Sequence, residues 1–212
     1  MDDAPEPPPT PAEKPPRSLL TTEILITLPT LVISIALAYF SFVQADASRK
    51  MQRTETWPYV SYGTDNSSPD VKDEISFSLS NDGVGPARLE EMTFLYDGKP
   101  MRDPLEFVSD CCAGAAKAVA KNLTYTTDRV DGVLRPGEKR RFIRLAKTDQ
   151  NALVWNKLND ERWKVVVRTC YCSIFEDCWV FDSAKGRPDQ VKVCPPDWTK
   201  FEERPNSRPV RI

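Results

Sequence analysis

The stretch ISFSLS, Ile75–Ser80, followed by NDGVGP, Asn81–Pro86, decides the fold of this chain. Its three large apolar residues alternate with three serines, and this period of two is typical of a β-strand with one buried face. The Asn, Asp and Gly residues that follow favour a turn, because glycine takes positive φ without steric cost. The stretch therefore predicts a strand that turns back into a second strand over Leu89–Tyr96.

Further strands are predicted on both sides of this pair. Tyr59–Tyr62 suits a first strand, and Val130–Leu134 and Lys139–Leu145 flank a turn that contains Pro and Gly. Trp163–Cys172 alternates over a longer stretch, with its aromatic and valine side chains on the face that we expect in the core. Five residues connect this strand to Cys178–Phe181, which predicts a hairpin.

Two helices are predicted between the strands. The Ala-rich segment 103–121 suits one, and 149–158 begins with an aspartate that can accept free amides at a helix start. Some seven short strands with one or two short helical insertions predict a mainly β domain, an immunoglobulin-like β-sandwich over residues 57–194. Residues 195–212 lack periodicity and predict an irregular C-terminal tail.

An apolar segment precedes this domain. The twenty residues Ile24–Val43, ILITLPTLVISIALAYFSFV, carry no charge, and at about 1.5 Å per residue they match a hydrocarbon layer roughly 30 Å thick. We place a transmembrane helix at 19–45 and a helical stalk at 46–56, which ends where Pro58 disfavours helical geometry in the preceding residue. A signal peptide cleaved near Ala45 is the alternative, but the apolar run is too long and its upstream flank is acidic and Pro-rich.

Charges near the span do not settle its orientation. Residues 1–18 are Pro-rich and predict a disordered tail. Two basic residues precede the span, whereas Arg49, Lys50 and Arg53 follow it, so the positive-inside count mildly favours a cytoplasmic C-terminal domain. All six cysteines follow the span, however, and an oxidising compartment explains an even set most simply. We therefore expect a cytoplasmic N-terminus and an exported C-terminal domain.

Composition disfavours several classes of function. The chain has 29 basic and 31 acidic residues and a formal net charge of -2, so it offers no basic surface for nucleic acid. Histidine is absent, which removes the usual general base near neutral pH and the commonest zinc ligand. No motif identifies a catalytic residue, so we expect a protein that is not an enzyme and has no cofactor.

The cysteines are the main candidate site. Cys172 and Cys178 bracket the short hairpin connection and are predicted to pair across it. The pairing of the others stays open, since Cys170 faces away from the expected core, where a segment with Cys111, Cys112 or Cys194 can cover it. Adjacent cysteines more often bond elsewhere, because closing their own small ring strains the peptide, although a vicinal Cys111–Cys112 redox switch is the alternative.

A second interpretation of the cysteines is functional. Cys170, Cys172 and Cys178 offer clustered thiolates for thiol-redox chemistry or for a soft metal ion. We favour structural bridges over a metal site, since there is no CxxC pair and the setting is exported. Trp57, Trp163 and Trp179 present a similar choice between a ligand platform and core packing, and we favour the core.

The order of parts resembles a family of uncharacterised bacterial inner-membrane proteins with one span and a periplasmic β-sandwich. The resemblance is carried by Trp57–Tyr59, Asn81–Ala87 and Leu134–Glu138, and it covers most of Ile24–Phe181. It implies a bacterial inner-membrane location with the domain in the periplasm. We therefore predict an anchored module with an interaction or structural role, attached through Ile24–Val43 and bound to another envelope protein, with a thiol-redox or metal-handling protein as the alternative.

Overall fold

A computed structural model of the chain describes residues 17–69, 72–119 and 128–202. The N-terminal tail predicted for residues 1–18 therefore lies outside the described residues except for Arg17 and Ser18, as does the end of the predicted C-terminal tail, residues 203–212. The chain forms two units, Met1–Met51 and Gln52–Ile212. We describe each unit by itself.

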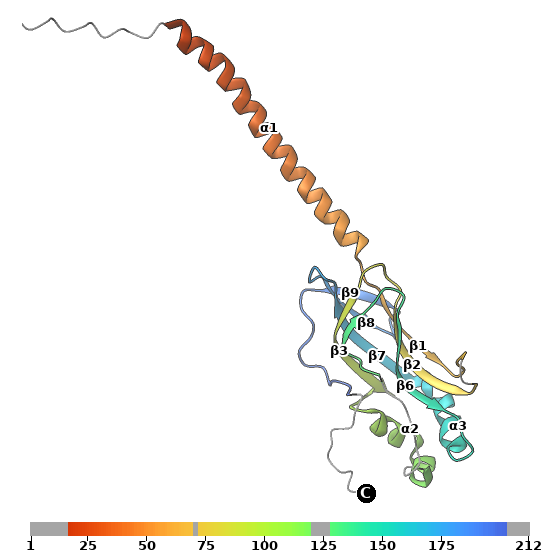
Figure 1. Ribbon diagram of the computed structural model, residues 1–212. Coiled ribbons are helices and arrows are strands. Elements are labelled where there is room, and N and C mark those ends of the chain that lie inside the picture. Colours follow the sequence, from red (N-terminus) through yellow and green to blue (C-terminus); the bar gives the residue numbers. More distant parts are fainter. Residues whose placement is uncertain (1–16, 70–71, 120–127, 203–212) are drawn as a thin grey trace, which may run out of the picture. The chain divides into compact units, whose positions relative to one another are not determined.

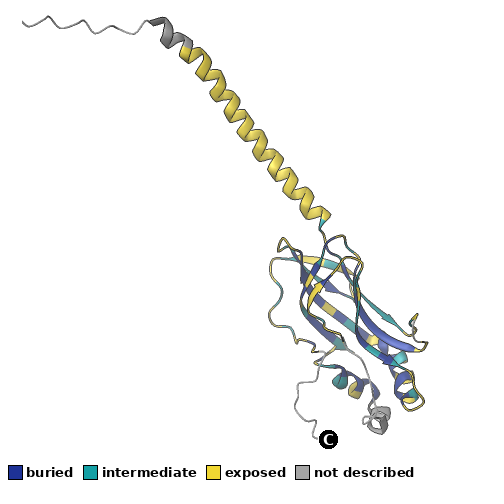
Figure 2. Ribbon diagram, in the orientation of Figure 1, coloured by how far each residue is buried: buried dark blue, intermediate teal, exposed yellow. Residues whose placement is uncertain are grey.

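The first unit is dominated by the helix α1, Arg17–Glu55, which contains 39 residues and whose last turn belongs to the second unit. All its side chains from Glu23 onward are exposed (Figure 2). Hydroxyl groups in its apolar part donate to backbone carbonyls one turn back, as Ser34 does to Thr30 and Ser41 to Leu37. These polar side chains therefore have hydrogen-bond partners within the helix and do not need water. Within the described residues, α1 is the helix that is long and apolar enough to cross a membrane.

The second unit contains two antiparallel sheets (Figure 1). The first has the order β1-β2-β6, with β1 at Val60–Asp65, β2 at Glu74–Asn81 and β6 at Lys139–Ala146. The second has the order β4-β3-β7-β8-β9, and β5 also pairs with β3. Its strands are β3 (Ala87–Tyr96), β4 (Lys99–Met101), β5 (Gly132–Leu134), β7 (Val165–Cys172), β8 (Cys178–Asp182) and β9 (Arg187–Val191). The prediction of a mainly β chain with an apolar N-terminal helix is confirmed.

Two further helices, α2 (Pro104–Val119) and α3 (Ala152–Glu161), lie together at one end of the sheets (Figure 1). Both fall close to the predicted insertions. The strand predicted from Trp163 instead begins at Val165, because Arg162–Lys164 forms a 3₁₀ turn, η1. The short strands β4 and β9 were not anticipated from the sequence.

Both sheets and α2 share one hydrophobic core. The three alternating apolar side chains of β2 are at most 1% exposed, as the period of two predicts. Among them, the ring of Phe77 lies 5.7 Å from the ring of Phe94 in the other sheet and 5.7 Å from that of Phe107 in α2. These edge-to-face contacts add specificity to the burial of large apolar surfaces. The two sheets therefore pack face to face around aromatic rings.

Asn81, at the end of β2, joins three segments at one end of this core. Its side chain is fully buried, and its amide nitrogen donates to the carbonyl oxygens of Gly85 (2.8 Å) and Leu134 (3.0 Å). Its side-chain oxygen accepts from the backbone N–H groups of Tyr59 (3.2 Å) and Gly83 (3.1 Å). A buried amide that makes four hydrogen bonds fixes the turn after β2 against the segments that precede β1 and end β5.

Replacing Asn81 with alanine should leave these four backbone groups without their partner. We expect Asn81→Ala to lower the free energy of unfolding by about 2–4 kcal/mol, since each buried, unsatisfied group is costly. Urea denaturation of the full chain in detergent measures the change. The exposed Asn66, whose amide bonds Asn159 at the surface, provides the matched control, and Asn66→Ala should change the value by less than about 0.5 kcal/mol. Equal effects of the two substitutions would contradict this role.

Glu161, at the end of α3, connects that helix to β3. Its carboxylate accepts from the hydroxyl of Tyr96 at 2.6 Å and pairs with the ammonium groups of Lys164 (2.6 Å) and Lys157 (2.9 Å), while its side chain is 11% exposed. The hydrogen bond from Lys164, followed by those from Tyr96 and Lys157, lowers the pKa of Glu161 from 4.5 to about 2. The carboxylate therefore stabilises the fold only while it is ionised.

The lowered pKa fixes the sign of a pH effect. Because the folded-state pKa lies below the ordinary value, the stabilisation by Glu161 is present above pH 4.5 and is lost as the pH falls toward about 2. We expect Glu161→Gln to destabilise the chain at pH 7 and to approach the stability of the parent protein as the pH falls through this range. Urea denaturation at a series of pH values measures the difference. A difference independent of pH would show that the ionised carboxylate is not the stabilising species.

Candidate functional site

The first disulfide closes the hairpin between β7 and β8. Cys172 and Cys178 lie directly opposite each other in the antiparallel pair, with Cα atoms 4.0 Å apart and a sulfur–sulfur bond between them. This is the pair that the hairpin spacing suggests. Within the turn, the backbone N–H of Ser173 donates to the carbonyl oxygen of Asp177 at 2.8 Å. The bridge and this hydrogen bond together hold the turn in one shape.

The second disulfide joins Cys170 of β7 to Cys194, with Cα atoms 5.7 Å apart. Of the segments that the sequence left as alternatives, the C-terminal one therefore covers β7. This segment continues beyond residue 194, where the backbone N–H of Phe201 donates to the carbonyl oxygen of Met92 at 2.9 Å. Phe201 is 4% exposed and belongs to the core, beyond the expected end of the domain at residue 194. Cys170 is fully buried beneath this segment.

The third disulfide is vicinal and joins Cys111 to Cys112 in α2. The sequence favoured bonds from these cysteines to other segments, and the structure differs. The reason is topological. Strand β3 begins beside the β7–β8 turn and ends at the opposite end of the sheet, where β4 and α2 follow. Cys111 and Cys112 are therefore far from the other cysteines. Cys112 has a non-helical backbone, with φ -130° and ψ 23°, which interrupts α2.

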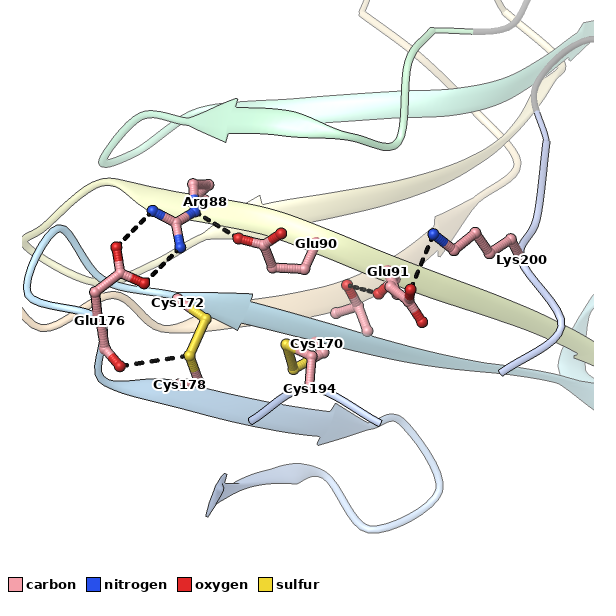
Figure 3. Close-up of a disulfide and its surroundings, with 10 residues drawn as sticks. Arg88, Glu90, Glu91, Cys170, Cys172, Glu176, Cys178, Cys194 and Lys200 are labelled. Carbon is pink, nitrogen blue, oxygen red and sulfur yellow. Dashed lines mark hydrogen bonds and ion pairs between the residues drawn. A yellow bond between two sulfur atoms is a disulfide. The ribbon is translucent and has the colours of Figure 1, made fainter. Parts of the chain in front are cut away.

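The first two disulfides form one sulfur cluster on the outer face of β7 (Figure 3). The Sγ atoms of Cys172, Cys178 and Cys194 all lie within 4.8 Å of one another, and Cys170 is bonded to Cys194. In the described part of the chain, these three cysteines form the group with the spacing of metal ligands. Metal ions bind thiolates, and here every one of these sulfurs is held in a disulfide. The arrangement shown is therefore that of two adjacent disulfides.

Charged side chains surround this cluster. The guanidinium of Arg88 makes two hydrogen bonds to the carboxylate of Glu176, at 2.9 and 2.8 Å, and also bonds Glu90 (Figure 3). The hydrogen bond to Glu176, together with that to Glu90, raises the pKa of Arg88, and Arg88 lowers the pKa of Glu176. Because Arg88 and Glu90 lie on β3, these bonds connect the hairpin turn to the neighbouring strand. They are solvent-exposed, so their contribution to stability is small.

Four apolar side chains are exposed at the end of the domain that carries this turn. We name them the apolar tip: Trp57, Val84, Ile174 and Phe175, which are 43%, 66%, 60% and 37% exposed. The backbone N–H of Val84 donates to the carbonyl oxygen of Trp57 at 3.1 Å, so these two residues are neighbours. Ile174 and Phe175 form the turn between the paired cysteines. The tip thus combines three segments that are distant in the sequence.

A surface cavity connects Trp57 to the base of the hairpin. Its volume is about 310 Å³, and it is lined by Arg53, Thr54, Trp57, Asp177, Trp179 and Gln190. The guanidinium of Arg53 lies 3.5 Å from the carboxylate of Asp177 within it. The apolar tip thus has a paired charge and a shallow cavity at its margin.

The tryptophans do not all lie in the core as predicted. Trp163 in η1 is 70% exposed, with the guanidinium of Arg162 4.0 Å from its ring centre. Trp57 is part of the apolar tip, and Trp179 is partly buried against the core, where its ring stacks on that of Tyr171 at 5.9 Å. The expectation failed for Trp163 because the 3₁₀ turn shifts it out of the alternation of β7.

Sequence reasoning missed the apolar tip altogether. One signal for it was available: Ile174 and Phe175 occupy a five-residue connection, SIFED, where polar residues and glycine are usual. Comparison with protein-family models, with curated proteins and with solved structures finds no match to this chain. Two features of the β domain can therefore bear on function, the apolar tip and the sulfur cluster.

The two bridges should differ in their contribution to stability. They close loops of different length, because the paired cysteines are separated by 6 and 24 positions in the sequence. In the chain-entropy description, the longer loop gives the larger effect. We expect Cys172→Ala/Cys178→Ala to lower the free energy of unfolding by about 2.2 kcal/mol and Cys170→Ala/Cys194→Ala by about 3.5 kcal/mol. Urea denaturation of the oxidised full chain measures both, and the reverse order would contradict this account.

Proposed function

We propose that the chain is a membrane-anchored protein-interaction module whose β domain is exported and binds another envelope protein. The observation that carries this proposal is the apolar tip. Exposed apolar side chains scattered singly are ordinary on protein surfaces, but a group that gathers at one end of a domain, with a polar rim, marks an interaction site. Trp57 and Phe175 supply the large aromatic surfaces that contribute most at such sites.

The rim of the tip favours a protein partner over a lipid surface. Glu176 and Asp177 directly follow the two apolar residues of the turn, and acidic side chains are repelled by anionic lipid headgroups. Surfaces that insert into membranes instead combine apolar residues with lysine and arginine. In a protein interface, the same carboxylates, already paired with Arg88 and Arg53, can remain at the hydrated margin.

Two further features support the export and the class of the domain. The six cysteines are joined in three bonds, and disulfides persist in oxidising compartments such as the bacterial periplasm. The order β1-β2-β6 in one sheet and the neighbours β3-β7-β8 in the other correspond to strands A-B-E and C-F-G of an immunoglobulin-like sandwich. These features accord with the resemblance to bacterial inner-membrane proteins, with α1 as the anchor and the N-terminus in the cytoplasm.

We propose a binding protein and not an enzyme. The chain has no histidine, and the residues that form the tip are apolar side chains without a nucleophile or a general base among them. Binding through such a surface depends on burial of its apolar atoms, and a rigid turn reduces the entropy that is lost when a complex forms.

Site-specific photo-crosslinking in native membranes tests this function. A photoreactive amino acid at Ile174 should give a discrete adduct, because this side chain would be buried in the complex. The same probe at Leu153, which lies on α3 and is 71% exposed, provides the matched control and should give none.

The adduct must also depend on the rest of the tip. We expect Trp57→Ser, combined with Val84→Ser, to reduce the adduct at Ile174 at least about tenfold, since the loss of large contact side chains costs about 1.4 kcal/mol or more. Thermal unfolding of the doubly substituted chain checks that the domain remains folded. Equal labelling from Ile174 and Leu153, or an adduct indifferent to Trp57 and Val84, would show that the tip is not the binding surface.

A further inference from the structure

The sulfur cluster on β7 differs from an ordinary pair of structural bridges in its geometry. A thiolate formed in one disulfide can attack another only where the two lie close together. Here the Sγ atom of Cys194, from one bridge, lies within 4.8 Å of both sulfurs of the other, Cys172 and Cys178. Thiol–disulfide exchange requires a thiolate to approach a disulfide sulfur directly. The cluster brings the partners of that reaction together.

The four cysteines also differ in accessibility. Cys170, Cys172 and Cys178 lie in β7 and β8 and are 0%, 3% and 7% exposed. Cys194 is partly exposed and follows β9 outside any strand. Accessibility decides which sulfur of a disulfide is attacked by a thiol from solution. Cys194 is therefore the sulfur that an incoming thiolate meets first.

From these two observations we infer that the cluster is a thiol–disulfide exchange site for a dithiol, in which Cys194 accepts the first attack and passes the exchange to the Cys172–Cys178 bridge. This inference goes beyond the proposed interaction function and does not depend on it.

The first stage reduces the outer bridge. A thiolate of the dithiol attacks Sγ of Cys194, a bond forms between them, and Cys170 leaves as a thiolate that takes up a proton. The second thiolate of the dithiol then attacks its own sulfur in this mixed disulfide and releases Cys194 as a thiolate. The dithiol has lost two electrons and become a disulfide, and the Cys170–Cys194 bridge has gained them.

The second stage is internal and needs no further reactant. The Cys194 thiolate attacks Sγ of Cys172 or Cys178, the bond between these two breaks, and the sulfur that is not attacked leaves as a thiolate and is protonated. A disulfide from Cys194 to β7 or β8 replaces the hairpin bridge. Electrons are conserved, since one protein disulfide is exchanged for another. The turn that carries Ile174 and Phe175 then loses its closing bond.

A single substitution isolates the internal stage. In Cys170→Ser the thiol of Cys194 has no partner of its own and lies beside the Cys172–Cys178 bridge. After acid quenching, linked peptides are mapped, and we expect Cys194 to be joined to Cys172 or Cys178. We also expect the cysteine released from the hairpin bridge to be alkylated at least about tenfold more than in the parent chain. Cys111→Ser is the matched control, because it also creates one free thiol, at Cys112, and it should leave both bridges of the cluster intact.

A measurement on the unsubstituted chain covers the case in which Cys170→Ser does not fold. Less than one equivalent of dithiothreitol is added to the full-length protein in detergent, the reaction is quenched with acid, and linked peptides are mapped. Cross-pairs that contain Cys194 with Cys172 or Cys178 are expected among the products. If both experiments show only the original pairs, with the Cys172–Cys178 bridge untouched by Cys194, the exchange site does not exist. This result would leave the photo-crosslinking at the apolar tip, done on oxidised protein, unaffected.

Discussion

The pairing of β3 with β7 is the constraint on which the rest of the β domain depends. It extends from Arg88 opposite Cys172 to Tyr96 opposite Val165, and it fixes which side chains of β7 face the other sheet. Val167, Thr169 and Tyr171 on that face are fully buried. A shift of one residue would exchange the two faces of β7, since side chains alternate with a period of two. The register therefore also determines where the cysteines lie.

The cysteines of β7 occupy the face that the other sheet does not cover. Cys170 is nevertheless fully buried, because the segment beyond β9 crosses this face and is bonded to it through Cys194. The same segment then reaches β3, where Phe201 donates to Met92 between the parts of β3 that pair with β5 and β4. A short irregular segment thus completes both the outer face of the sheet and one edge of β3, and the bridge offsets the entropy of ordering it.

Much of this arrangement follows from local sequence signals, and the remainder depends on contacts that such signals do not contain. The alternation of β2 and the cysteines around the hairpin depend on neighbours a few residues apart, so periodicity and spacing suffice for them. Residues 187–191, RPDQV, become strand β9 only because β8 offers a free edge, which overrides a composition typical of a loop. Cys111 bonds Cys112 because the topology separates α2 from the other cysteines. The apolar tip has the same origin, since only folding brings Trp57, Val84 and the turn to one end of the domain.

The β7–β8 hairpin carries three cysteines of the sulfur cluster and two residues of the apolar tip, Ile174 and Phe175, and this proximity has a physical consequence. A turn with exposed apolar side chains binds best when it is rigid, because ordering a flexible turn costs free energy on association. The Cys172–Cys178 bond supplies that rigidity at the base of the turn, and the bonds of Arg88 to Glu176 hold its far side against β3. Exchange at Cys194 would remove the first restraint and leave the second, whose exposed charges contribute little. The redox state of one bridge would therefore set how well the turn of the proposed binding surface is ordered, without any change in its residues.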